Sequence, residues 1–379
     1  MDVVVTGIGL ASALGNLEAS WNGLLEARSS IRLYQPFLDL KPKPLALISP
    51  QPAELVPLTQ QVVLEALQDA GLSLPLSDCG VVVGSSRGNQ AEWEELSRQF
   101  YLEDESISLK GWLKTLPNAA AIATARLLQT RASVLSPMAA CATGIWAIAQ
   151  GCELIRSGQC QRVVAGAVEA AITPLTLTGF DRMGALAKAG CYPFDIDRQG
   201  LVLGEGGAVL VLESAALANH RGARIYGQVL GFGLTADGHH VSAPKQESKA
   251  AIAAVRQCLQ RSQLSPQDID YIHAHGTSTP LNDRNEAYLI QQLFPLGVPV
   301  SSTKGATGHT IGASGALGAA FCLMALQHQT LPPCVGLKSP EFDLDFVRTA
   351  RSTAAENALC LSFGFGGQNA AIALRVDSD

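Results

Sequence analysis

The chain has 379 residues, of which 47% are hydrophobic and only 16% are charged. This length and composition exclude a disordered chain and a small disulfide-held scaffold, and they leave room for two domains of roughly 150 residues or more. Lys and Arg number 27 and Asp and Glu number 33, which gives a net charge of -6 without charge runs. We therefore expect no nucleic-acid partner.

The nine cysteines form neither a CxxC pair nor a cluster at zinc-ligand spacing. We therefore expect reduced thiols, no metal site and a cytoplasmic protein. The run Met1–Val5 lacks the basic leader of a secretory signal. The uncharged stretch Ala132–Cys152 is long enough to raise the question of a membrane span, but polar residues and Pro137 interrupt it. A buried strand, turn and helix is the prediction there.

Short β-branched runs alternate with helical patterns along the chain, which predicts a layered α/β architecture. The expected strands are Val3–Thr6, Gly80–Gly84, Arg162–Gly166, Ala208–Leu212, Tyr271–Ala274 and Ala358–Phe363. The expected helices are Leu64–Ala70 and Gly144–Ser157, each followed by a glycine that permits a left-handed turn. The second helix would bury a stripe made of Ile145, Ile148, Cys152 and Ile155.

Two pairs of segments suggest an internal duplication. Cys141–Gly144 leads into one Ala-rich helix, and Gly308–Gly312 leads into another, Ala313–Leu326. The run Val3–Gly9 also has an echo in Gly227–Gly233. A polar, basic stretch at 219–224 lies between these halves. We therefore divide the chain into an N-terminal half, 1–222, and a C-terminal half, 223–379.

The first motif with chemistry is Ser136-Pro-Met-Ala-Ala-Cys141-Ala-Thr-Gly144. Its small residues form a turn that places a cysteine at the start of a buried helix. A thiol there is close to the helix dipole and to free backbone N–H groups, which favour the thiolate. The alternative is a small core cysteine, since cysteine is among the most buried residue types.

Three further motifs follow in the second half. His273-Ala-His275-Gly-Thr277-Ser-Thr279-Pro280 runs from a strand into a polar turn, a common place for an active-site histidine. Ser301-Ser-Thr-Lys304-Gly-Ala-Thr-Gly308-His309 precedes the second Ala-rich helix, and Ser362-Phe-Gly-Phe365-Gly366-Gly367 has glycines that let a backbone approach a ligand. Taken alone, each motif also has a structural interpretation: a core histidine for the first, a surface lysine for the second and a tight strand-end turn for the third.

Together and in this order, the motifs resemble those of the β-ketoacyl-acyl-carrier-protein synthases, most closely the elongating type II condensing enzymes. The resemblance covers almost the whole chain and includes Pro193-Phe-Asp-Ile-Asp-Arg198 and Gly204-Glu-Gly-Gly207. It implies a thiolase-like five-layered α-β-α-β-α fold made of two similar halves, and a homodimer. The implied reaction is the decarboxylative condensation of an acyl thioester with malonyl-acyl-carrier protein, so the expected partner is an acyl-carrier protein that brings its own phosphopantetheine.

The resemblance also implies roles for individual residues. Cys141 matches the nucleophile that carries the acyl chain, and a thiolate suits this because it both attacks and leaves a thioester readily. His275 and His309 match the histidine pair that binds the malonyl carbonyl and stabilises the enolate. Lys304 matches the lysine that orients this pair. No metal or redox cofactor is expected.

The remaining expected site residues hold the substrate. The backbone N–H groups of Cys141 and Phe365 match an oxyanion hole, and Phe365 also matches a gating aromatic. Thr277 and Thr279 would bind the pantetheine amides. His240, in the entrance segment Asp237-Gly-His-His-Val-Ser-Ala-Pro, and Phe363 complete the expected substrate-binding set.

Three departures from the family pattern limit these expectations. Gly318 stands where elongating members place a glutamate that pairs with the lysine, so Lys304 would lack that partner, and a Gly318→Glu change would restore it. The segment Leu45–Gln61 contains no Lys or Arg, although the family uses basic residues there to bind the carrier protein. The segment Ser86–Pro117, where the family shapes its acyl pocket and dimer contact, matches poorly.

Three other functions differ from this one in their motifs. A thiolase would carry its second catalytic cysteine in a different glycine motif, and an initiating type III synthase would carry Asn where this chain has its second histidine. A non-catalytic partner subunit, like a chain-length factor, would lack the nucleophile. The presence of Cys141, His275, His309 and Lys304 favours an active acyltransferase over that third possibility.

Overall fold

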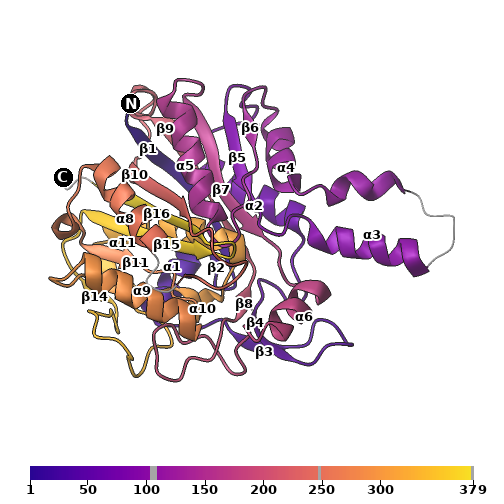
Figure 1. Ribbon diagram of the computed structural model, residues 1–379. Coiled ribbons are helices and arrows are strands. Elements are labelled where there is room, and N and C mark those ends of the chain that lie inside the picture. The colour runs from indigo at the N-terminus through magenta and orange to yellow at the C-terminus, as the bar shows by residue number, and fades with distance from the viewer. Residues whose placement is uncertain (103–108, 246–248, 377–379) are drawn as a thin grey trace.

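The computed structural model describes residues 1–102, 109–245 and 249–376 (Figure 1). A large mixed sheet has the order β12-β11-β15-β16-β10-β1-β9-β7-β5-β6, with β2 paired to β1 outside this path. The bounds of its strands are β1 Val3–Ser12, β2 Gly15–Asn16, β5 Gly80–Gly84, β6 Val134–Leu135, β7 Arg162–Glu169, β9 Gly206–Ser214, β10 Gly227–Ala236, β11 Tyr271–His273, β12 Val300–Ser301, β15 Asn357–Gly364 and β16 Gln368–Arg375.

The strand order is symmetrical about the antiparallel pair β1 and β10. From β1 the sheet continues through β9, β7, β5 and β6, and from β10 it continues through β16, β15, β11 and β12. The two sequence echoes, Val3–Gly9 and Gly227–Gly233, lie in these two central strands and therefore side by side. All six expected strands are present, several of them longer than predicted.

Two helices fill the centre of the molecule, α5 (Thr143–Arg156) and α11 (Ser314–Gln327), close to the bounds that the sequence predicted. Almost every residue of α11 is buried, because it lies between α5 and both parts of the sheet. The two helices approach closely where Gly144 meets Ala316: a Cβ on Gly144 would lie 2.4 Å from the backbone nitrogen of Ala316. This crossing places the start of α5 against the start of α11.

Outer helices cover both parts of the sheet. On one side lie α2 (Leu55–Asp69) and α4 (Ala119–Leu128), and on the other lie α8 (Lys249–Ser262) and α9 (Pro280–Leu293). In β9, Leu210 and Leu212 face the central helices whereas Val209 and Val211 face α2. The layers therefore alternate α-β-α-β-α, which confirms the predicted fold.

The helix predicted over Leu64–Ala70 is the second half of α2, which begins at Leu55. The prediction was too short because Pro57 interrupts the pattern, yet proline is tolerated in the first turn of a helix, where its missing N–H has no partner to lose. The buried positions Leu55, Leu58 and Val62 continue the helical spacing across it. No residue of α2 is Lys or Arg.

Smaller elements surround this frame. They are the helices α1 Leu17–Leu25, α6 Pro174–Arg182, α7 Ala215–His220 and α10 Lys304–Thr307, the 3-10 turns η2 Pro266–Asp268 and η3 Ile311–Ala313, and the strands β3 Arg32–Tyr34, β4 Lys43–Ala46, β8 Leu203–Gly204, β13 Thr330–Leu331 and β14 Arg351–Ser352. Within the described residues, no helix is both long and apolar enough to cross a membrane. The stretch Ala132–Cys152 is the expected strand, turn and helix, since it holds β6 and most of α5.

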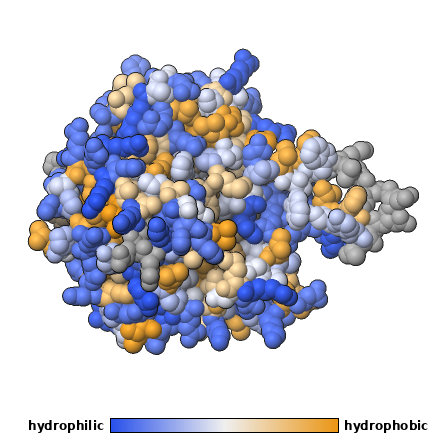
Figure 2. All heavy atoms as spheres, in the orientation of Figure 1, coloured by the Kyte–Doolittle hydropathy of each residue, from blue (hydrophilic) through white to orange (hydrophobic). Residues whose placement is uncertain are grey.

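An arm extends from the body of the molecule, made of α3 (Gln90–Leu102) and the 3-10 turn η1 (Leu109–Thr115) (Figure 1). Large side chains on it are exposed, among them Phe100 at 61% and Tyr101 at 82%. Figure 2 shows apolar residues on this arm on the face in view. The arm lies within Ser86–Pro117, the segment that matched the family poorly, and residues 103–108 are outside the described part.

Candidate active site

Cys141 lies in the tight turn that joins β6 to α5. Ala140, the residue before it, has a φ of 47°, a left-handed conformation that is costly for a residue other than glycine. The Thr143 hydroxyl holds this turn: its oxygen accepts the N–H of Ala139 at 2.9 Å and it donates to the carbonyl of Ala140 at 2.7 Å. The turn thus presents the Cys141 sulfur to a cavity while the residue stays 6% exposed.

The end of β15 packs directly against Cys141. The Ser362 hydroxyl donates to the carbonyl of Cys141 at 2.8 Å. Gly364 is required by the close approach, because a Cβ there would lie 2.9 Å from the Cys141 nitrogen. Backbone N–H groups of Phe365 and of Cys141 itself lie close enough to the sulfur to favour its thiolate form.

Burial dominates the ionisation of this thiol. It raises the pKa of Cys141 to about 12, although the Lys304 charge and the two N–H groups act in the opposite direction. The sequence analysis expected the start of the helix to favour the thiolate. Burial outweighs that effect, so the free protein carries a thiol at neutral pH.

His275 and His309 come from separate segments and line the same cavity as Cys141. His275 lies two residues beyond β11, and His309 lies in the turn between α10 and η3. Their ring centroids are 5.4 Å apart, edge to face. A ring nitrogen from each histidine and the Cys141 sulfur all lie within 4.8 Å of one another. The structure therefore brings together the three residues that the sequence singled out.

Both histidines are neutral at pH 7. Burial, and after it the positive charge of Lys304, holds the pKa of His275 and of His309 well below 6.5. The Lys304 ammonium lies 3.5 Å from Nδ1 of His275 and also donates to the His275 carbonyl. Because an ammonium can only donate, Nδ1 of His275 is the acceptor, which leaves the proton on Nε2.

Lys304 is itself buried at the start of α10, at 3% exposure, and the groups around it affect its ionisation. Burial lowers the pKa of Lys304, and the charge of Glu286 opposes that change. Glu286, on α9, accepts the backbone N–H groups of His275 and Gly276 at 2.6 and 2.7 Å. Gly318 offers Lys304 no partner, as the sequence predicted, and burial raises the pKa of Glu286 to about 7, so this carboxyl is only partly ionised at neutral pH.

Sequence reasoning missed Glu286. Its spacing could have indicated it, since Asp283 and Glu286, three residues apart, face the same side at the start of the helix that follows the His275 motif.

Glu169 was missed as well. Its buried carboxylate accepts the N–H of Ser86 at 2.9 Å and that of Gly312 at 3.0 Å, and so ties the turn after β5 to the one after His309.

The cavity has a volume of about 340 Å³ and is lined by Cys141, both histidines and several predicted substrate-binding residues. Thr277 and Thr279 lie on its wall with their hydroxyls 2.8 Å apart. Phe363 and Phe365 also line it. Phe365 stacks on Phe180 of α6 with ring centroids 5.9 Å apart, and Phe180 is a wall residue that sequence analysis did not find.

His240 is not among the residues that line the cavity, so its contact with substrate stays a prediction. It is exposed, and its Nδ1 accepts the backbone N–H groups of Ser242 and Ala243, both at 3.1 Å. Ser242 and Ala243 do line the cavity. The His240 ring therefore fixes the backbone of the segment 237–244 through these two hydrogen bonds.

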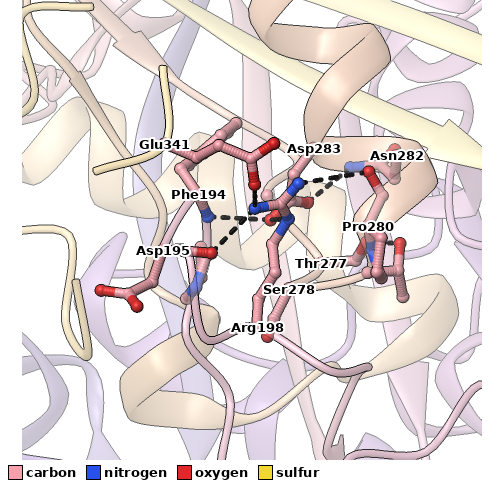
Figure 3. Close-up of polar contacts among 12 residues, drawn as sticks. Phe194, Asp195, Arg198, Thr277, Ser278, Pro280, Asn282, Asp283 and Glu341 are labelled. Carbon is pink, nitrogen blue, oxygen red and sulfur yellow. Dashed lines mark hydrogen bonds and ion pairs between the residues drawn. The ribbon is translucent and has the colours of Figure 1, made fainter. Parts of the chain in front are cut away.

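A buried network around Arg198 holds the loop that carries the two threonines (Figure 3). The Arg198 guanidinium donates to the carbonyls of Asp195 and Pro280 and forms ion pairs with Asp283 and Glu341. Asp283 in turn accepts the N–H of Phe194 at 2.8 Å. Since Pro280 directly follows Thr279, this network joins the Pro193–Arg198 segment to the substrate side of the cavity.

Cys141, His275 and His309 also form a group that could bind a soft metal ion through sulfur and nitrogen. The Lys304 ammonium next to His275 disfavours a cation at this position. The same three groups suit a different task, in which a sulfur nucleophile and two neutral N–H donors act on one carbonyl compound.

Comparisons with known proteins agree with this geometry. The model of the β-ketoacyl synthase N-terminal domain matches residues 37–218, and that of the β-ketoacyl synthase C-terminal domain matches residues 226–338. A 3-oxoacyl-(acyl-carrier-protein) synthase 2 from Synechocystis sp. is 34% identical, with 98% of this chain and 97% of that protein covered. Nodulation protein E from Rhizobium meliloti is 33% identical, with 98% of each chain covered.

Solved structures are similar over the full length. A β-ketoacyl synthase from Burkholderia phymatum has a TM-score of 0.90 and 27% identity, covering 100% of both chains. A ketosynthase solved with its type II polyketide acyl-carrier protein has a TM-score of 0.94 and 27% identity, with 99% of each chain covered. The matched domains, the near-complete coverage and the five-layered fold together establish that the chain belongs to the β-ketoacyl synthase family.

Proposed function

We propose that the protein catalyses the decarboxylative condensation of an acyl thioester with malonyl-acyl-carrier protein, giving a 3-oxoacyl-acyl-carrier protein during chain elongation. The observation that carries this proposal is the convergence of the Cys141 sulfur and one ring nitrogen each of His275 and His309 within 4.8 Å in the lining of one cavity. Family members named 3-oxoacyl-(acyl-carrier-protein) synthase support an acyl-transferring condensing enzyme.

In the first half-reaction, the Cys141 sulfur attacks the carbonyl of an acyl thioester. A new carbon–sulfur bond forms, the carrier thiol leaves with the proton, and the acyl chain stays on the protein. Charge develops on the carbonyl oxygen, where the N–H groups of Cys141 and Phe365 would stabilise it. Because burial raises the pKa of the thiol, its proton must be lost as the substrate arrives rather than beforehand.

In the second half-reaction, the malonyl thioester binds with its carbonyl at the two histidines. The bond to the carboxylate breaks, carbon dioxide leaves, and the electron pair forms an enolate that attacks the acyl carbonyl on Cys141. Cys141 then departs as the thiolate. The enolate oxygen would accept N–H bonds from neutral His275 and His309, so the donors act mainly where charge appears.

The protonation of each histidine suits this role. Lys304 makes Nδ1 of His275 an acceptor. The Ser314 hydroxyl lies 2.8 Å from Nδ1 of His309 and would donate to it in the same way. Both rings would then direct an Nε2–H toward the substrate. Thr277, Thr279 and Phe363 would contact the pantetheine arm at the wall of the cavity, and Phe365, stacked on Phe180, would gate it.

No metal or redox cofactor takes part in the proposed reaction, and phosphopantetheine would arrive on the carrier protein. We further propose a cytoplasmic homodimer. Support for a dimer comes from the exposed apolar side chains of the arm and from Val134 and Leu135 of the edge strand β6, at 41% and 39% exposure, which a second copy would cover. We also propose that the chain consists of two halves, residues 1–222 and residues 223–379.

Acyl-enzyme formation tests the proposal against a non-catalytic partner subunit. The protein is incubated with acyl-carrier substrates of graded chain length, and intact mass and peptide mapping locate the acyl group. An adduct on Cys141, followed by a 3-oxoacyl product once malonyl-carrier protein is added, is expected. A protein that gains no acyl mass would instead be a scaffold subunit. Light scattering of the purified protein measures whether it is a dimer.

A further inference from the structure

Gly318 is a buried glycine whose backbone does not require glycine. It lies in the middle of α11, and its φ is not in the left-handed region. It is required for space: a Cβ there would lie 2.8 Å from Nδ1 and Cε1 of His273 and 2.7 Å from the Cys360 sulfur. The imidazole of His273 therefore occupies the volume next to Gly318.

His273 is a third histidine beside the catalytic pair, and it does not line the cavity. It ends β11 and is 2% exposed, and it lies two residues before His275. Its Nε2 is 3.1 Å from the Thr303 hydroxyl, and its Nδ1 is 3.8 Å from the Cys360 sulfur. Both ring nitrogens thus have partners inside the protein, so the ring is fixed at both ends.

Thr303 links this ring to the proposed chemistry, because it directly precedes Lys304. Its hydroxyl makes no capping bond to α10, whereas its carbonyl accepts the N–H groups of Ala306 and Thr307. Helix α10 has only four residues and cannot hold its own position through helical hydrogen bonds alone. The bond to His273 is therefore a side-chain tether at the point where Lys304 enters the site.

We propose that His273 is a positioning residue that, through Thr303, keeps the Lys304 ammonium beside His275, and that Gly318 provides the space its ring needs. The proposal rests on the proposed function of Lys304 and the histidine pair. A glutamate at position 318 would not fit this arrangement as a partner for Lys304. Even the first carbon of that side chain would collide with His273 and Cys360.

The test separates the two half-reactions in three variants. His273→Leu removes the ring nitrogens, Thr303→Val removes the hydroxyl with little change in shape, and His273→Gln returns an amide nitrogen close to the position of Nε2. Decarboxylation of malonyl-carrier protein should fall roughly tenfold or more in the first two variants and stay within about threefold in the third. Acylation of Cys141 should change less than about twofold in all of them.

A double variant and a glycine control sharpen the test. Combining His273→Leu with Thr303→Val should lower decarboxylation no further than either change alone, since both remove one link. Gly318→Ala should lower decarboxylation in the same selective way. The control is Gly151→Ala, in the middle of α5, where the added Cβ would meet Ala165 and Leu212 instead. This control should lower thermal stability, and the ratio of the decarboxylation rate to the acylation rate should stay as in the parent protein.

Two results would overturn the proposal: a His273→Leu protein that decarboxylates at the parent rate, or one that loses both half-reactions in proportion to lost folded protein. A crystal structure of Thr303→Val gives a readout that does not depend on activity. The Lys304 nitrogen should move beyond about 3.5 Å from Nδ1 of His275. If the parent protein itself fails to decarboxylate malonyl-carrier protein, the proposed function is wrong. The role of His273 is then still tested by the position of the Lys304 nitrogen in the Thr303→Val crystal structure.

Discussion

The turns in front of α5 and α11 occupy corresponding places in the two halves of the molecule, yet they carry opposite chemistry. Before α5, the turn ends in a nucleophile, with the N–H groups of Cys141 and Phe365 close to its sulfur. Before α11, the turn carries His309, whose Nδ1 faces the Ser314 hydroxyl. One frame was thus used twice, once to accept an acyl group and once to provide a hydrogen-bond donor.

Burial has opposite effects on the two sides. It raises the pKa of the Cys141 thiol to about 12, and it lowers the pKa of His275 and His309 well below 6.5. In each case the neutral form is favoured, because a low-dielectric site disfavours charge of either sign. The histidines are therefore ready for their proposed role in the free protein, whereas the nucleophile must still lose a proton.

The largest effect is expected from Cys141→Ala, which removes the nucleophile in the turn before α5 and leaves both histidines in place. Condensation should fall by about 10³-fold or more because no group remains to accept the acyl chain. Malonyl-carrier decarboxylation should continue, since both histidines are intact. Product analysis by mass spectrometry measures the first rate, and release of carbon dioxide measures the second. Loss of both would show that the two sides do not act separately.

The second prediction concerns His309→Ala, which removes the imidazole in the turn before α11 and leaves Cys141 in place. Decarboxylation should fall by about 10²- to 10³-fold, because one donor to the enolate oxygen is lost. The acyl adduct on Cys141 should still form, and intact-mass measurement after single-turnover acylation checks this. His275→Ala should behave alike. A His309→Ala protein that decarboxylates at the parent rate would remove the enolate role assigned to this ring.

The two sides should also respond differently to pH. The raised pKa of Cys141 means that its thiolate fraction grows about tenfold per pH unit between about pH 7 and 9, so the rate of alkylation by iodoacetamide should rise in parallel without a plateau. The lowered histidine pKa values mean that both rings stay neutral across this range. Decarboxylation by Cys141→Ala should therefore show no step from the ionisation of either histidine, and a step near pH 7 would come from Glu286, whose pKa burial raises to about 7. An alkylation plateau near pH 7 would indicate a preformed thiolate.

The smallest effect is expected from Ser314→Ala, which removes the partner of Nδ1 in His309. Decarboxylation should fall about fivefold, the size of one hydrogen bond, because the ring can then take either tautomer. Ser314→Thr keeps a hydroxyl and serves as the matched variant, with partial or full activity. Equal rates in both variants would mean that the tautomer is set by another group.

Much of the fold was predictable because its signals are local. The strands at Gly80–Gly84 and Arg162–Glu169 are short apolar runs that are buried on both faces, and the start of α5 is marked by small residues. The start of α2 was missed, because a proline in the first turn looks like an interruption in a linear sequence. The hydrogen bonds from Ser242 and Ala243 to the His240 ring were also not predictable, since the order of residues in a loop does not show which way a side chain turns.

The residue types and their order can be read from the linear chain: a cysteine before one Ala-rich helix, and histidines and a lysine before the other. Their ionisation follows from the folded protein, because the pKa values of Cys141 and the histidines depend on how completely the two halves enclose them. The folded protein also determines which residues lie next to one another. Glu286 near Lys304 and His273 in the space beside Gly318 follow from the crossing of strands and helices that are far apart along the chain.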